Sequence, residues 1–143
     1  MKKLSMFCKS YRGDFERLKV LLESYRQYNK DKIPFYLSIP KNDKHLLDFD
    51  VSDINVVYDE DLYTFKYNID GWRQQQIIKH FFHKKCPSDN YIIIDSDCRF
   101  IKDFYIDDFI AYDNVPYTVC HTNELGSTYE ISFSKKSLVI EKC

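Results

Sequence analysis

The sequence predicts an α/β fold in which a mainly parallel sheet has helices on both faces. Short apolar runs bounded by loop residues alternate along the chain with longer segments of helical periodicity. One run, residues 91–94, is apolar at every position, as in a parallel strand that is buried on both faces. No linker, repeat or low-complexity tract divides the 143 residues, so residues 1–143 are predicted to form a single domain.

The first half of the chain is predicted to alternate strands and helices. Residues 4–8 form a strand, and a helix of about four turns follows Asp14, a favourable N-cap residue. Apolar side chains mark the buried face of this helix at Phe15, Leu18, Leu21, Leu22, Tyr25 and Tyr28. Two further strands are predicted at residues 33–40 and 54–58, with a short helix at 41–49 between them.

The second half is predicted to place a central strand behind a helix. The helix spans residues 72–85 and ends before Pro87, and the central strand is residues 91–94. Residues 100–101 either continue this strand or form its hairpin partner. Short strand-like pieces at 117–120 and 129–133 complete the pattern.

The composition is that of an ordinary globular protein. Hydrophobic residues make up 44% of the chain and charged residues 30%, and the aromatic content of 17% argues against disorder. The net charge of −1 and the absence of a basic stripe favour no nucleic-acid partner. No signal peptide or transmembrane segment is recognisable. The five cysteines include no C-x-x-C pair, which favours reduced thiols and a cytoplasmic protein.

Two carboxylates, Asp95 and Asp97, follow the predicted central strand directly. Ligands of open α/β sheets bind at the carboxyl ends of the strands, which is where this pair lies. Mg²⁺ and Mn²⁺ prefer oxygen ligands and often take only one or two from protein, with phosphate and water supplying the rest. The pair therefore predicts a metal-assisted phosphate site. The alternative interpretation is a solvated turn, because Asp and Ser are common where strands end.

The predicted helix at 72–85 has a polar face that suits a sugar phosphate. At 100° per residue, one side carries an aromatic ring, two amides and a cation: Trp72, Gln75, Gln76, Lys79, with His83 beyond them. The opposite side carries the apolar residues Ile77, Ile78, Phe81 and Phe82. The alternative is a solvated polar face with Trp72 packed near the start of the helix.

Three segments in order resemble a known family. Residues 91–101, YIIIDSDCRFI, resemble the strand with a D-x-D motif in glycosyltransferases of the GT-A fold, the nucleotide-diphospho-sugar transferase superfamily. Residues 71–79, GWRQQQIIK, resemble a helix with the pattern W-x-x-Q-x-x-x-K in one bacterial and viral branch. The opening, FCKSY followed by DFERL, is similar to the first strand and nucleotide loop of that branch.

The resemblance implies a metal-dependent glycosyltransferase with a Rossmann-like sheet. It would bind a nucleoside-diphosphate sugar with Mn²⁺ or Mg²⁺ and pass the sugar to a hydroxyl of an unidentified glycan, lipid or small molecule. Asp97 would ligate the metal, and Asp95 would contact the metal or the ribose. The other donor-binding residues would be Ser10 and Tyr11 near the nucleoside, and Trp72, Gln75, Gln76 and Lys79.

The chain is short for a complete enzyme of this family. Only residues 102–143 follow the D-x-D strand, and residues 105–143 are predicted to be an incomplete acceptor-side region. A non-catalytic or truncated nucleotide-sugar-binding domain, completed by a partner chain, is therefore the alternative to an active glycosyltransferase. A phosphatase of the haloacid dehalogenase type is a lesser alternative, because its D-x-D lies early in the chain and is followed by Thr or Val, where Cys98 stands here.

Overall fold

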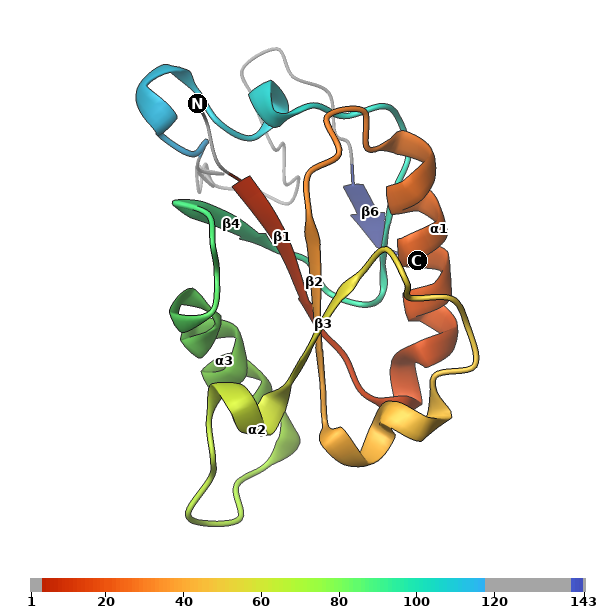
Figure 1. Cartoon of the computed structure of the whole chain (residues 1–143), viewed down its shortest axis with the longest axis vertical. Helices are drawn as coiled ribbons and strands as arrows, with labels where there is room; N and C mark the ends of the chain where they lie inside the picture. The colour runs from red at the N-terminus through yellow and green to blue at the C-terminus, as the bar shows by residue number, and fades with distance from the viewer. Residues whose placement is uncertain (1–3, 118–139, 143) are drawn as a thin grey trace, which may run out of the picture.

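The computed structural model describes residues 4–117 and 140–142, and it contains a parallel sheet of four strands in the order β3-β2-β1-β4 (Figure 1). The strands are β1 (Leu4–Lys9), β2 (Phe35–Ile39), β3 (Asn55–Tyr58) and β4 (Asn90–Ile93). β1 pairs with β2 on one side and with β4 on the other, and every pairing in this sheet is parallel. The predicted α/β class with a mainly parallel sheet is confirmed.

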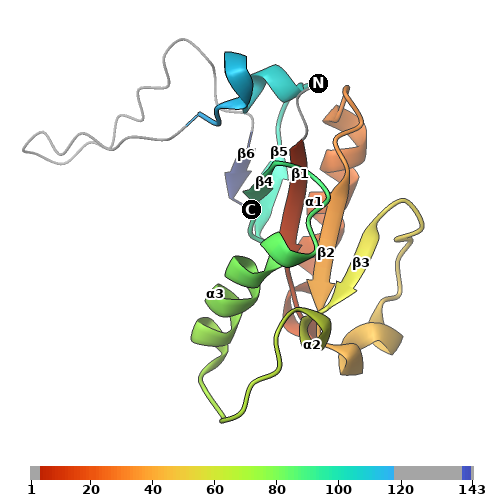
Figure 2. The same ribbon diagram turned by 60° about the vertical axis from the view of Figure 1, so that its left-hand side comes forward.

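Helices cover both faces of the sheet (Figures 1 and 2). The α-helices are α1 (Phe15–Tyr28), α2 (Asp59–Leu62) and α3 (Gly71–Phe81). Short 3-10 helices connect the elements: η1 (Arg12–Asp14), η2 (Lys41–Leu46), η3 (Phe82–Lys84), η4 (Ile106–Asp108) and η5 (Tyr112–Asn114). The short helix predicted at 41–49 is therefore a 3-10 helix, and the one predicted at 72–85 changes to 3-10 geometry after Phe81.

β1 supplies side chains to both cores because successive residues of a strand point to opposite faces. Met6 and Cys8 belong to the cluster that packs against α1, whereas Phe7 belongs to the cluster that packs against α3. Every residue of β1 is buried. The two clusters therefore place α1 and α3 on opposite faces, as the sequence predicted.

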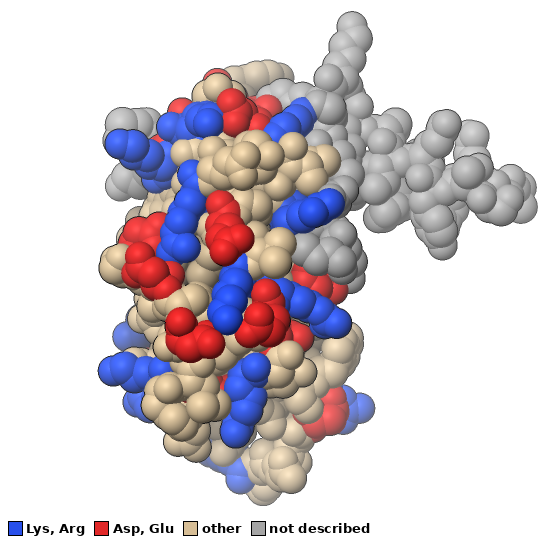
Figure 3. All heavy atoms as spheres, turned by 90° about the vertical axis from the view of Figure 1, so that its right-hand side faces the viewer, with Lys and Arg blue, Asp and Glu red and all other residues tan. Residues whose placement is uncertain are grey.

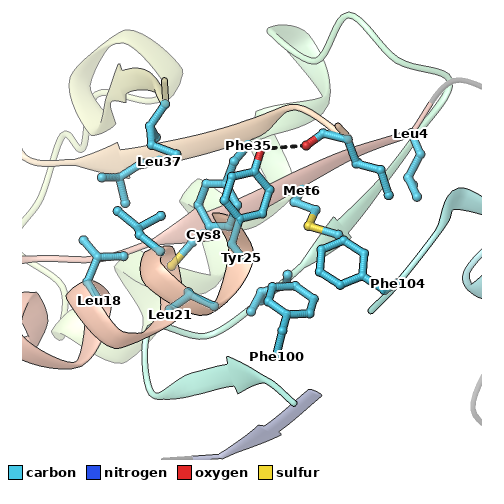
Figure 4. Packing of buried hydrophobic residues seen from close by; sticks show 14 of the residues in the cluster. Leu4, Met6, Cys8, Leu18, Leu21, Tyr25, Phe35, Leu37, Phe100 and Phe104 are labelled. Atoms are coloured by element: carbon cyan, nitrogen blue, oxygen red, sulfur yellow. Dashed lines mark hydrogen bonds between the residues drawn. The ribbon is translucent and has the colours of Figure 1, made fainter. Parts of the chain in front are cut away.

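The α1 face holds the larger core (Figure 4). Leu18 and Leu21 of α1 point toward β1 and β2, and both are fully buried. The hydroxyl of Tyr25 is satisfied within this core, since it donates to the carbonyl oxygen of Ile33 at 2.7 Å. The helical spacing predicted this face correctly, except that Tyr28 is only partly buried.

Aromatic packing dominates the α3 face. The ring of Phe7 stacks on that of Phe82 with centroids 4.0 Å apart, and Tyr91 meets both rings edge-on. Ile78 of α3 and Leu62 of α2 complete the buried set. This packing fixes α3 beside β1 and β4, which matters for the site because α3 carries several of the predicted donor-binding residues.

Residues after β4 do not continue the parallel sheet. β5 (Cys98–Phe100) pairs antiparallel with β6 (Ile140–Lys142) in a separate two-stranded sheet. Both alternatives for residues 100–101, a continuation of 91–94 or its hairpin partner, are therefore wrong. Of the strand-like pieces at 117–120 and 129–133, all but Tyr117 lie outside the described residues, as does most of the predicted acceptor-side region.

The prediction that residues 91–94 form a central strand is also wrong. Among the described strands, β4 is at the edge of the sheet and has β1 as its one neighbour. Ile93 is 46% exposed. Sequence hydrophobicity reports what the two faces of a strand contact, and it carries little information on whether a second strand pairs along its edge.

No helix in the described part of the chain is long and apolar enough to cross a membrane.

Candidate functional site

The connection order of the sheet places a topological switch point at the carboxyl ends of β1 and β4. We call the place around this switch point the crevice. From β1 the chain moves to β2 and then β3 on one side, and it returns to place β4 on the other side of β1. Ligands of open α/β sheets bind outside the carboxyl ends of the strands at such a switch point. Phe7 is in register with Ile93, so the loop after β1 and the loop after β4 leave the sheet next to each other.

A hydrogen bond joins these two loops. The hydroxyl of Ser96 donates to Oδ2 of Asp14 at 3.2 Å, although the two residues are 82 positions apart. Ser96 is 6% exposed, so the middle residue of the D-S-D sequence faces inward while Asp95 is exposed. Asp14 stands at the predicted N-cap position, yet its side chain makes no capping hydrogen bond, because it bonds to Ser96 and contacts Arg17 instead.

Lys79 reaches the first aspartate from α3. Its Nζ donates to Oδ1 of Asp95 at 2.6 Å and to Oε1 of Gln75 at 3.0 Å. Its side chain is only 9% exposed, whereas that of Asp95 is 49% exposed. Three of the residues predicted to bind the donor are therefore in one hydrogen-bonded group at the crevice.

The other two residues of that helix face lie apart from this group. Trp72 is 70% exposed, and Gln76 is exposed too. Trp72 precedes Lys79 by seven residues, which corresponds to about 10 Å along a helix. The helical periodicity placed these side chains on one face, and only the end of that face near Lys79 meets the D-x-D loop.

Ser10 and Tyr11 differ in accessibility. Ser10 is 1% exposed, and its Oγ finds no hydrogen-bond partner among the described residues. Tyr11 is 46% exposed. Its ring lies against Gly13, where an added Cβ would come within 2.6 Å of a ring carbon. Of these two predicted nucleoside contacts, Tyr11 is the one that presents its side chain to solvent in this structure.

The acidic residues at the crevice fit a metal that takes few protein ligands. Asp95 is half-exposed, and no described residue donates to its second oxygen, Oδ2. Asp97 is partly exposed. Across residues 4–117 and 140–142, no group of three or more His, Cys, Asp or Glu is placed to hold a metal ion. A metal bound by Asp95 and Asp97 would therefore need further ligands such as phosphate oxygens and water.

A buried ion pair lies at the carboxyl end of β1, on the same side of the sheet as the D-x-D loop, and it was not predicted from the sequence. Lys9 ends β1, and its Nζ lies 2.9 Å from Oδ2 of Asp59, the first residue of α2. The hydroxyl of Ser38 donates to the other oxygen of Asp59 at 2.6 Å. Burial raises the pKa of the Asp59 carboxyl above its ordinary value, while the charge of Lys9 opposes this rise. The sequence contained one indication of this ion pair, because Lys9 directly follows the apolar residues of a predicted strand and could therefore be expected to be partly buried.

Asp43 was missed as well. It is 1% exposed, and its Oδ2 accepts from the backbone N–H of Arg12 at 2.8 Å. The Nε of Arg12 lies 3.1 Å from its Oδ1. Asp43 thereby anchors the loop after β1 to the segment after β2. Sequence gave no signal for this role, since Asp43 stands in a polar stretch with no periodicity.

A cavity lies away from the aspartates. It has a volume of about 400 Å³ between α1 and β5 and is bordered by both charged and apolar residues: Val20, Glu23, Ser24, Gln27, Tyr28, Arg99, Phe100 and Ile101. The surface along α1 carries acidic and basic side chains in alternation (Figure 3). Pairs such as Lys19 with Glu16 and Arg26 with Asp53 account for this mixture.

Comparison with protein families matches residues 3–139 to DUF6492, which is described as a family of unknown function. The chain belongs to DUF6492. The matched region includes the loop after β1, the whole of α3 and the D-x-D loop, so the crevice lies within the part of the chain that DUF6492 covers. A search of curated proteins gives no match.

Proposed function

We propose that the chain binds a nucleoside-diphosphate sugar together with Mn²⁺ or Mg²⁺ and transfers the sugar to an acceptor hydroxyl. The observation that carries the proposal is the meeting of three predicted segments at the switch point of the sheet. Ser96 of the D-x-D loop bonds to Asp14 after β1, and Lys79 of α3 bonds to Asp95. A crevice with carboxylates and a lysine at this position suits a metal-bound diphosphate.

The proposed role of each residue at the crevice follows from the charge or the ring of its side chain. Asp97 and Asp95 would hold the metal, and the bound metal would neutralise the charge that develops on the leaving diphosphate. Lys79 would place a positive charge beside the same phosphates, and Gln75 keeps its ammonium group in position. Tyr11 presents an exposed ring at the end of the loop after β1, where a nucleobase can pack against it.

The proposal includes a cytoplasmic location. Among the described residues, Cys8 and Cys86 are free cysteines, which fits a protein in a reducing compartment.

Turnover of nucleotide sugars tests this function. The purified chain is incubated with UDP-, GDP-, ADP- and dTDP-linked sugars, each with Mn²⁺, with Mg²⁺ and with EDTA. Release of the nucleotide is then measured, since many transferases hydrolyse the donor slowly without an acceptor. The expected result is release from one nucleotide class that requires the metal. No release and no binding in any condition contradicts the proposal.

Two other outcomes identify the alternatives. Binding of a nucleotide sugar without turnover supports a non-catalytic binding domain, and addition of a partner chain that restores turnover supports a shared site. Metal-dependent release of phosphate from a phosphomonoester, with nucleotide sugars left intact, supports the phosphatase instead.

A further inference from the structure

Lys79 holds one of the carboxylates that the proposed metal would use. Its Nζ is 2.6 Å from Oδ1 of Asp95, and it takes a second acceptor from Gln75 at 3.0 Å. The lysine is nearly buried, whereas the aspartate is half-exposed. The ion pair therefore has an inner positive end and an outer negative end that a ligand in solvent can reach.

No other described carboxylate is bonded to Lys79. Its neighbourhood includes Cys8, which is fully buried, and burial raises the pKa of this thiol well above its ordinary value, so that it stays neutral. An ammonium group with so little exposure is strongly destabilised if its counter-charge is removed. Lys79 thus depends on Asp95, or on an anion that replaces it.

A divalent cation at Asp95 disturbs this balance. It shares the carboxylate charge that neutralises Lys79, and it adds two positive charges close to an ammonium group in a partly dry environment, where repulsion is strong. A diphosphate reverses both effects, because its oxygens can ligate the metal and also accept a hydrogen bond from Lys79.

We propose that Lys79 makes metal binding at Asp95 and Asp97 depend on the arrival of a diphosphate. The inference rests on the proposed function and adds to it an order of binding, in which the metal is held weakly until the nucleotide is present. Because coupling between two ligands is reciprocal, the metal strengthens diphosphate binding by the same factor.

A titration with Mn²⁺ measures this coupling without any turnover. Free Mn²⁺ is followed by electron paramagnetic resonance as it is added to the protein alone and to the protein with UDP, GDP, ADP or CDP. Matched titrations of each nucleotide without protein correct for the Mn²⁺ that nucleotides bind. For the natural sequence, the expected result is that one nucleotide tightens Mn²⁺ binding by about tenfold or more.

Two variants remove the charge of Lys79. In Lys79→Met and Lys79→Gln, Mn²⁺ alone is expected to bind several-fold more tightly, and the nucleotide is expected to tighten Mn²⁺ binding by a several-fold smaller factor than in the natural sequence, because direct ligation of the metal by the diphosphate remains. Lys30→Met is the control, because Lys30 pairs with Asp103 at 3.1 Å just beyond the end of α1, away from the D-x-D loop, and its side chain is 41% exposed where that of Lys79 is 9% exposed. The control should behave as the natural sequence does.

The outcomes separate this inference from the function on which it rests. If the natural sequence binds neither Mn²⁺ nor any nucleotide, the proposed function fails. If it binds both without coupling, or if the coupling factor in a folded Lys79 variant equals that of the natural sequence, only the role of Lys79 is overturned. Circular dichroism shows whether each variant folds, and Lys79→Gln, which keeps a hydrogen-bonding group, decides the result if Lys79→Met does not fold.

Discussion

Lys9 and Asp59 bury opposite charges beside the candidate site, with side chains 9% and 14% exposed. The attraction between such charges is offset by the free energy needed to remove them from water, so the pair contributes little net stability. Loss of one partner is different, because the other charge is then left buried and unpaired. This asymmetry gives a prediction that depends on pH.

Lys9→Met should lower the free energy of unfolding at pH 7 by about 3 kcal/mol. Burial already raises the pKa of Asp59, and removal of Lys9 raises this pKa further. A carboxyl whose pKa is higher in the folded protein than in the unfolded one destabilises the fold as pH rises, so the loss should shrink near pH 4, where Asp59 takes up a proton. Urea unfolding at the two pH values measures both effects.

A double variant serves as the control for this pair. Asp59→Asn added to Lys9→Met removes the unpaired charge and keeps an oxygen that can accept from Ser38. It should recover most of the lost stability at pH 7. A Lys9→Met variant that loses the same free energy at both pH values contradicts the assignment of a buried ion pair.

At this scale, sequence reasoning located the candidate residues better than it described their surroundings. Asp95 and Asp97 could be placed at the end of a strand because an apolar run stops directly before them. The burial of Lys79 could not be predicted, because helical periodicity gives the direction of a side chain and not what lies opposite it. The buried partners Asp43 and Asp59 depend on contacts between distant segments.

Helix α3 carries Lys79 and Gln75 at the crevice, and Asp70 caps the start of this helix. Oδ1 of Asp70 accepts from the backbone N–H of Arg73 at 3.0 Å. Asp70→Ala should therefore lower the free energy of unfolding by about 1 kcal/mol, as loss of a helix cap does. Thermal or urea unfolding measures the change.

Asp70→Ser is the matched control for the cap, because serine retains an oxygen that can accept the same hydrogen bond. It should be closer in stability to the natural sequence than to Asp70→Ala. Equal losses in the two variants would show that the carboxylate acts in some way other than capping, such as through its ion pair with Arg73.

The sequence predicted helices and strands well where a periodic pattern extends over several helical turns, as in α1. It predicted them less well where the same local pattern is compatible with more than one place in a sheet, as in β4. β4 matched a buried central strand in sequence, but pairing along a strand edge is decided by the rest of the chain. β5 pairs with a strand from the far end of the sequence. A local pattern holds no information about so distant a partner.

At the scale of the molecule, the described residues form two cores that share one sheet. Ile39 lies in the core on the α1 face and Ile78 in the core on the α3 face, and each is at most 1% exposed. Ile39→Val and Ile78→Val should each lower the free energy of unfolding by about 1 kcal/mol, through lost burial and a small cavity. The double variant should lose the sum, because the two sites lie on opposite faces of the sheet.

Unfolding of these variants in urea also tests cooperativity. Since β1 belongs to both cores, we expect a single transition with the same midpoint by far-ultraviolet circular dichroism, which follows the backbone, and by near-ultraviolet circular dichroism, which follows the packed aromatic rings. Two separate transitions, each shifted by only one of the substitutions, would contradict the view that the sheet couples the two faces.

The central claim is that the crevice between β1 and β4 binds a nucleoside diphosphate through a metal held by Asp97. Calorimetric titration of the nucleotide selected in the Mn²⁺ experiments tests it most directly, with the natural sequence, Asp97→Asn and Asp103→Asn. Asp103 is a suitable control because it is an exposed aspartate that pairs with Lys30, next to the bridge between Asn29 and Phe104 and away from the D-x-D loop. Binding should require Mn²⁺, fall at least about tenfold in Asp97→Asn and stay unchanged in Asp103→Asn. Unaltered, metal-dependent affinity in Asp97→Asn would contradict the account.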